Sequence, residues 1–311
     1  MVQQREPLTG PAPPADPRRH RPSRTRLLVR RGIALGLLLA GLAIAFWLVT
    51  LAVGGLSEDP APKPTPVVAS APALKIIFPE GFTREQMGER IKAVNGIARE
   101  KRKISPRLSS EEYLKATASS KIPGTFAKDG KRRPLEGFLF PASYQFEQKT
   151  TSRQLVKRQL EAFERAWKQV DLSYARSRNL TPYDVLIIAS LIEKEVVAPE
   201  ERALVSAVIY NRLRLGMSLG IDATIRYGLK VPATESLRES HLEHPTPYNT
   251  RKHAGLTPTP IANPGLASMQ AAARPAKVDY LFFVRKQDKI HHFFTASEDE
   301  FNSFLDANGY G

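Results

Sequence analysis

The chain has 311 residues, of which 42% are hydrophobic, and it carries a formal net charge of +15. This length accommodates one large or two modest folded domains. The sequence has no cysteine, which excludes a disulfide framework and any metal site built on thiolates.

The first segment is rich in arginine and proline and precedes a long apolar run. Residues 1–31 hold eight arginines against two acidic residues, a composition that cannot bury a core and predicts a disordered tail. Residues 32–56 carry no charged side chain, and a helix of that length crosses a bilayer core of about 30 Å. We therefore predict a single-pass transmembrane helix over 32–56. Because arginines precede this run directly, we expect the N-terminus in the cytoplasm and residues 57–311 outside, in a protein of the cell membrane.

A cleaved signal peptide is the alternative for this region. Ala69-Ser70-Ala71 resembles a small-residue cleavage site, but it lies well beyond the apolar run. That run is also longer than the apolar part of a typical signal peptide, about 7–15 residues. We therefore favour a retained anchor.

The region after the apolar run begins with a spacer and then shows alternating strand and helix signals. Residues 57–73 are rich in proline and alanine and predict a semi-extended linker. We expect a strand at 74–78, a turn at 79–81, a helix over 83–94 and a second helix over 109–119, whose first turn is acidic. Aromatic side chains then occur at every second position in two pairs, Phe138 with Phe140 and Tyr144 with Phe146. This spacing is typical of the packed face of a strand. Stacking of these rings on sugar faces is the alternative.

The middle of the chain predicts a buried helix that ends in acidic residues. An amphipathic helix over 154–170 leads into it. Thr181, Pro182 and Asp184 then form a helix start, and the residues from Val185 to Ile192 are apolar except for one serine, as in a helix enclosed by protein.

Glu193 follows this run and shares a helix face with apolar residues, whereas Glu195 points the other way. A carboxyl group in such apolar company is partly desolvated, which favours its protonated form. A protonated carboxyl group near neutral pH is what general-acid cleavage of a glycosidic bond requires. The simpler alternative is that Glu193 marks the point where a buried helix meets water.

The last third predicts further helices and a hairpin, which makes the fold class α+β. A helix over 200–215 ends at a glycine, two apolar runs at 278–285 and 290–295 predict a β-hairpin, and a final helix covers 297–306. No metal site is expected, since His241 and His244 lack the HExxH spacing. A basic chain suggests nucleic acid as a partner, but the predicted export removes it. The anionic cell wall is a better match for the outer charge.

Several separated blocks resemble the YceG-like family of membrane-anchored endolytic murein transglycosylases. They are ASLIEKE, SAVIYNRLRLGMSLGIDATIRYGL and PYNTRKHAGLTPTPIANPG, in that order. The resemblance runs from about Leu74 to Phe304. It implies a small LysM-like subdomain over 74–134, which includes FPEGFTREQMGERI, and a catalytic domain over 135–311.

The resemblance also singles out further residues for substrate binding. Glu136 belongs to a block similar to the family's LEGxLFP and is a second carboxylate candidate. The other candidates lie in the YNRL, Asp-Pro-Thr and PYNTY blocks of the family: Asn211, Asp222, Thr224, Tyr248, Asn249 and Thr250. This chain departs from the pattern at Ala223, where proline is usual, and at Arg251, where tyrosine is usual.

The activity that the resemblance implies is cleavage of the β-1,4 bond between N-acetylmuramic acid and N-acetylglucosamine in nascent glycan strands. Glu193 would act as general acid and then as base, leaving a 1,6-anhydro end and terminating the strand. No cofactor is implied, and the expected partners are glycan strands, the membrane and peptidoglycan synthases or division proteins. Two alternatives stay open: hydrolysis with Glu136 or Asp222 as second carboxylate, and a non-catalytic scaffold that binds the wall or serves division.

Overall fold

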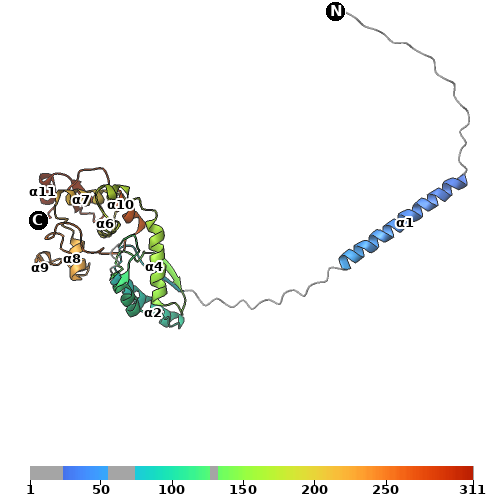
Figure 1. Cartoon of the computed structure of the whole chain (residues 1–311), viewed down its shortest axis with the longest axis horizontal. Coiled ribbons are helices and arrows are strands. Elements are labelled where there is room, and N and C mark those ends of the chain that lie inside the picture. The colour runs from blue at the N-terminus through green and yellow to red at the C-terminus, as the bar shows by residue number, and fades with distance from the viewer. Residues whose placement is uncertain (1–23, 55–73, 127–131, 311) are drawn as a thin grey trace, which may run out of the picture. The chain divides into compact units, whose positions relative to one another are not determined.

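The computed structural model describes residues 24–54, 74–126 and 132–310 (Figure 1). The chain divides into two units, Met1–Val68 and Ala69–Gly311. The predicted linker at 57–73 and most of the predicted tail lie outside the described residues. The second unit combines helices with three two-stranded sheets, which confirms the α+β class.

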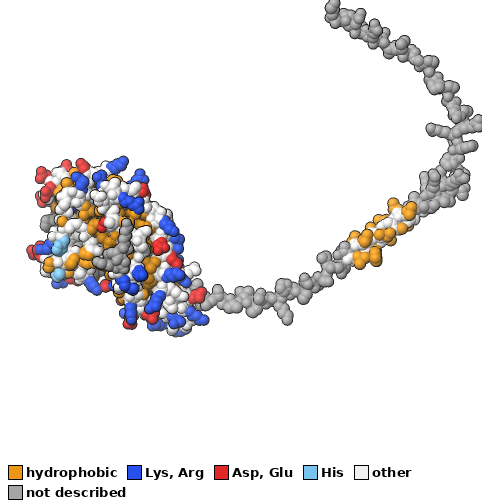
Figure 2. Space-filling view, in the orientation of Figure 1, with side chains coloured by type: hydrophobic (Ala, Val, Ile, Leu, Met, Phe, Trp, Pro, Cys, Tyr) orange, Lys and Arg blue, Asp and Glu red, His pale blue; other side chains and the backbone are white. Residues whose placement is uncertain are grey.

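Helix α1, Arg24–Gly54, covers most of the predicted apolar run. The large apolar side chains from Leu37 to Leu51 are all more than half exposed, and Figure 2 shows hydrophobic atoms around this part of the helix. Within the part of the chain that the structure describes, no helix combines the length and the apolarity needed to cross a membrane.

The second unit begins with strand β1, Leu74–Ile77, followed by helices α2, Arg84–Arg102, and α3, Ser110–Ala118. Thr83 starts α2 with a capping box, in which its hydroxyl accepts from the Gln86 N–H and the Gln86 side chain accepts from the Thr83 N–H. The helix runs eight residues past the predicted end at Val94. Asn95 does not stop it because this side chain is buried and donates to the Leu108 carbonyl at 2.5 Å.

Strand β4, Ser143–Phe146, pairs antiparallel with β1, so that Leu74 lies opposite Phe146 and Ile77 opposite Ser143. This sheet joins segments from both sides of the predicted boundary between residues 134 and 135. The division into a LysM-like subdomain and a catalytic domain stays a prediction within one compact unit. The other sheets pair β2, Ser120–Lys121, with β3, Arg132–Arg133, and β5, Phe282–Arg285, with β6, His292–Thr295, and the last pair confirms the predicted hairpin.

Helix α6, Pro182–Glu195, lies at the centre of the helical layer and packs against α7, Arg202–Leu215, and α10, Leu266–Ala273. Every residue from Val185 to Ile192 is buried, as the sequence predicts. The remaining elements are α4, Ser152–Trp167, α5, Ser173–Ser177, the 3-10 turn η1, Pro199–Glu201, α8, Asp222–Leu229, α9, Glu239–Leu242, and α11, Glu298–Ala307.

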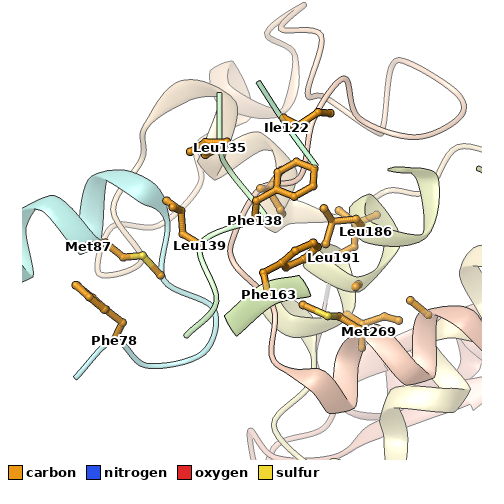
Figure 3. Close-up of a cluster of buried hydrophobic side chains, with 14 of the residues drawn as sticks. Phe78, Met87, Ile122, Leu135, Phe138, Leu139, Phe163, Leu186, Leu191 and Met269 are labelled. Carbon is orange, nitrogen blue, oxygen red and sulfur yellow. The ribbon is translucent and has the colours of Figure 1, made fainter. Parts of the chain in front are cut away.

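The hydrophobic core joins α6 to the N-terminal elements. Figure 3 shows Phe138 and Phe163 beside Leu186 and Leu191 of α6, and the two phenylalanine rings meet edge to face at 5.1 Å. Of the four alternating aromatic residues, Phe138, Tyr144 and Phe146 are buried and Phe140 is half-buried. Tyr144 and Phe146 lie on β4 as predicted, whereas Phe138 and Phe140 precede the strand, and Phe138 is buried without being part of it.

Candidate active site

Helix α6 is fixed at both ends, and this positions the acidic residues of its last turn. Its first turn carries a capping box between Thr181 and Asp184, with Pro182 at the first helical position. Near its C-terminus the buried Ser190 hydroxyl accepts from the Ile261 N–H at 3.0 Å. That bond ties the loop before α10 to the end of α6.

Glu193 lies at the end of α6, close to the start of α10 and to the turn that follows β1. The Gly265 N–H, at the N-cap of α10, donates to Glu193 Oε2 at 3.0 Å. Lys194 donates to the carbonyl of Gly81 at 3.3 Å. Glu193 itself is half-buried, so one side of its carboxylate is held by protein while the residue still reaches solvent.

Asn263 joins the three segments of this site, and sequence reasoning missed its role. Its backbone pairs with the turn after β1, accepting from the Gly81 N–H at 3.0 Å and donating to the Phe82 carbonyl at 2.9 Å. Its side chain donates to Glu136 Oε1 at 2.8 Å and accepts from the Leu139 N–H at 2.9 Å. The signal that could have found it is the Asn-Pro-Gly turn at 263–265 beside a buried run.

Glu136 is buried and binds other parts of the chain. Its carboxylate accepts from the Arg84 N–H at 2.9 Å, from Asn263 and from the Tyr227 hydroxyl at 3.2 Å. Its hydrogen bonds therefore join the N-terminus of α2 to α8 and to the 263–265 loop. Burial raises the pKa of Glu136 to about 7, although the hydrogen bond from Arg84 opposes that shift. Its contact with substrate stays a prediction.

Glu195 lies on another side of α6, as expected, but its surroundings differ from the expectation. Arg285 of β5 donates to the Glu195 carbonyl at 2.5 Å. Burial raises the pKa of the Glu195 carboxyl to about 7; Arg285 lowers it and Asp222 raises it. From the sequence, desolvation is expected only for the carboxyl group of Glu193. The structure shows desolvation at Glu195, because the C-terminal hairpin reaches that side of the helix.

The predicted residues around α8 form a polar cluster that shapes the loops. Thr224, Asn249 and Thr250 are buried. The Thr224 and Thr250 hydroxyls lie 3.0 Å apart, and Asn249 donates to the Leu242 and His244 carbonyls at 2.7 and 2.8 Å. Their role in substrate binding stays a prediction, since these bonds all join parts of the protein.

Two predicted residues of the same region reach the surface. Tyr248 is half-buried, and its hydroxyl lies 2.9 Å from that of Thr259. Asp222 is exposed and pairs with Arg251 at 2.7 Å. The Tyr248 ring also meets Tyr227 edge to face at 5.1 Å, which connects this surface to the Glu136 network.

Asn211 is not brought to Glu193. Its amide donates to the Val278 and Tyr280 carbonyls, both at 3.0 Å. It lines two adjacent cavities of about 500 and 640 Å³, the first of which also contains Asp184 from the opposite end of α6. Asp184 and Glu193 are nine positions apart in the helix, about 13.5 Å along its axis.

Within residues 24–54, 74–126 and 132–310, no group of three or more histidine or acidic side chains is arranged to hold a metal ion. The described site offers carboxylic acids, amides and hydroxyls. Carboxyl groups near a surface turn, with amide donors aimed at them, suit acid–base catalysis.

Comparison with known proteins identifies relatives of this chain. The chain is 32% identical over 224 residues to the endolytic murein transglycosylase of Bacillus subtilis, covering 71% of this chain and 61% of the relative. It is 33% identical over 224 residues to the endolytic murein transglycosylase of Streptococcus pneumoniae, covering 67% of this chain and 40% of the relative. The chain thus spans less than two thirds of the length of these relatives.

A solved structure and a family profile agree with these relatives. The crystal structure of a yceG-like protein from Listeria monocytogenes superposes with a TM-score of 0.64 at 28% identity, covering 75% of this chain and 76% of that one. The profile of the YceG-like family matches residues 63–306, which is most of the chain and includes every residue of the site described above. The chain belongs to the YceG-like family.

Proposed function

We propose that this protein is a lytic transglycosylase that cleaves the β-1,4 bond between N-acetylmuramic acid and N-acetylglucosamine in peptidoglycan. The observation that carries the proposal is the placement of Glu193, half-buried at the end of a buried helix and held through one oxygen by the Gly265 N–H. The relatives named endolytic murein transglycosylase support the substrate and the reaction class.

Glu193 has two tasks in this mechanism. As general acid it gives its proton to the glycosidic oxygen while the bond from that oxygen to the anomeric carbon of the muramic ring breaks. As base it then takes the proton of the C6 hydroxyl of the same ring, whose oxygen bonds to the anomeric carbon. No water is consumed and the carboxyl group is returned protonated, so a second carboxylate acting as nucleophile is not required.

The fixed position of Glu193 comes from the residues around it. The Gly265 N–H leaves the other carboxylate oxygen to face the substrate, and Asn263 keeps the loop that carries this donor in place. Glu136 supports the same loop by accepting a hydrogen bond from Asn263. Tyr248 and Asp222 reach the surface of the unit and are the predicted substrate-binding residues that can touch a sugar without rearrangement.

The cellular setting is a further part of the proposal. The uncharged run at residues 32–56 supports a membrane anchor, and the arginines of residues 1–31 support a cytoplasmic N-terminus. With residues 57–311 outside, cleavage in nascent strands would end glycan elongation near the membrane. Peptidoglycan synthases or division proteins are the expected neighbours there. Fractionation of cells that produce the full-length chain, beside a chain lacking 24–54, tests the anchor.

The test of the reaction is mass spectrometry of murein digested by the full-length protein. Glu193→Gln and Glu195→Gln are compared with the wild type, and Glu89→Gln, on the exposed side of α2, is the matched control. We expect anhydro-ended fragments from the wild type and the control. Loss of general acid–base catalysis should slow Glu193→Gln by about 10²–10⁴-fold.

The other outcomes are distinguishable. Fragments that are one water heavier would show hydrolysis and direct attention to the carboxylates near Glu193. An active Glu193→Gln with an inactive Glu195→Gln would transfer the acid role to the second carboxyl of the helix. Binding of murein without cleavage by a folded wild type would favour a scaffold.

A further inference from the structure

A second carboxylate, Glu80, lies beside Glu193 and has no role in the mechanism above. It occupies the middle of the turn Pro79-Glu80-Gly81, which directly follows β1 and Phe78. The side chain is exposed, so it is not part of the hydrophobic core. No argument from sequence spacing relates it to Glu193, which lies more than a hundred residues later.

Gly265 brings the two carboxylates together. A Cβ atom added to Gly265 would lie 1.8 Å from Glu80 Oε1 and 2.2 Å from its Cδ, so the Glu80 carboxylate rests directly against this glycine. The N–H of the same residue donates to Glu193 Oε2. The two carboxylates therefore converge on one residue, one against its Cα and the other on its amide.

The turn that carries Glu80 is held there by backbone contacts. Gly81 has φ of +75°, which favours glycine, and a Cβ at this position would lie 3.5 Å from Glu193 Cγ. The Gly81 N–H donates to the Asn263 carbonyl, and its own carbonyl accepts from Lys194. The approach of Glu80 to Glu193 is thus built into the way β1 joins α6 and the 263–265 loop.

The charged groups facing Glu80 come from three elements. Loss of water around the carboxyl raises the pKa of Glu80, the negative charge of Glu193 raises it further, and Arg202 of α7 lowers it. Lys194 of α6 lies on the other side of the turn, and the N-terminus of α10 points its Gly265 amide at Glu193. The charge of Glu193 therefore favours the protonated form of Glu80.

We propose that Glu80 is a positioning residue that shares one proton with Glu193 and keeps Glu193 supplied with the proton it donates to the glycosidic oxygen. The inference rests on the proposed transglycosylase function. When Glu193 gives its proton to the leaving oxygen, the pair becomes doubly ionised, which strengthens Glu193 as the base for the C6 hydroxyl proton. The proton gained from that hydroxyl restores the shared state, so the pair gains and loses one proton per turnover.

The first test does not depend on activity. Carbon-detected NMR of the full-length protein, labelled at the glutamate carboxyl carbons, follows the Glu80 resonance with pH; the resonance is assigned by its loss in Glu80→Gln. We expect the Glu80 midpoint to fall by about one pH unit in Glu193→Gln, because the neighbouring charge is gone. The matched variant Glu89→Gln should leave it unchanged. An unchanged midpoint in Glu193→Gln would overturn the inference.

The second test follows the pH dependence of kcat/KM for release of anhydro-ended fragments. We expect Glu80→Gln to move the alkaline limb to lower pH by about one unit, because the glutamine cannot hold the shared proton. Glu80→Asp, which keeps the charge, should restore part of that shift. A Glu80→Gln profile identical to wild type, with anhydro products still formed, would refute the role of Glu80 and leave the proposed function intact. Absence of anhydro products from the wild type would refute the function, whereas the NMR result would still decide the proton sharing.

Discussion

Replacement of Glu136 by glutamine should stabilise the protein increasingly as the pH rises from 4 to 8. Glu136 is only 2% exposed, and burial raises its pKa from an ordinary value of 4.5 to about 7. At 1.36 kcal/mol for each pH unit, ionisation of this carboxyl costs the folded state about 3 kcal/mol once the pH exceeds 7.

The sign follows from the direction of the shift. Because the folded pKa lies above the unfolded one, the stability that the protonated acid contributes is complete below pH 4.5 and is lost as the pH rises through about 7. A glutamine stays neutral throughout. It also fits the existing donors, since its oxygen can accept from Arg84 and Asn263 while its amide faces the rotatable Tyr227 hydroxyl.

The assay is denaturant unfolding of the full-length wild type and Glu136→Gln at several pH values, with Glu89→Gln as the exposed control. The difference in unfolding free energy between Glu136→Gln and wild type should grow by about 3 kcal/mol between pH 4 and pH 8, and the control should track the wild type. A difference that stays constant over this range would refute the reasoning that an ionised Glu136 is disfavoured in the folded state.

Three further predictions concern the helix termini and buried pairs. Gly265→Ala should displace the Glu80 side chain yet barely change the melting temperature, because Glu80 is exposed and can rotate away. The effect of Gly265→Ala on the pH profile of kcat/KM should vanish in a Glu80→Gln background. Equal effects in both backgrounds would contradict this prediction. Thr181→Ala should cost about 1 kcal/mol of unfolding free energy through loss of the α6 capping box, measured by denaturant titration. Glu201→Ala should cost about 1–3 kcal/mol because it leaves the buried His292, whose Nδ1 lies 2.6 Å from Glu201 Oε2, without its hydrogen-bond partner. A loss under about 1 kcal/mol would show that the pair contributes little.

The fold could be predicted wherever the signals are local. The start of α6 is predicted by its capping residues, Thr181, Pro182 and Asp184. The apolar run that follows predicts the burial of every residue from Val185 to Ile192. The hairpin at 282–295 follows from two aromatic runs around a polar turn. The extension of α2 beyond Val94 could not be predicted, because it depends on the burial of Asn95 and on its amide donating to a carbonyl 13 residues further along the chain.

The candidate site could be predicted only where one helix carries it. Glu193 stands out because its neighbours on α6 are apolar. Its hydrogen bond from Gly265 and the effect of its charge on Glu80 depend on two loops from distant parts of the chain, which no periodicity relates. The burial of Glu195 depends in the same way on Arg285 of β5. Glu136 was found through the family block that contains it, yet its buried network with Asn263 and Tyr227 became visible only in the structure.

The pairing of β1 with β4 and the closure of the 79–81 turn also determine when a functional site can exist during synthesis. Gly81 meets Lys194 across 113 residues, and Phe82 meets Asn263 across 181. Contacts so distant in sequence close late, after local helices such as α2 and α3 have formed. A nascent chain that has not yet produced residue 265 cannot hold Glu193 or bring Glu80 to it. The proposed glycan-cutting activity would therefore arise only when the whole unit has folded.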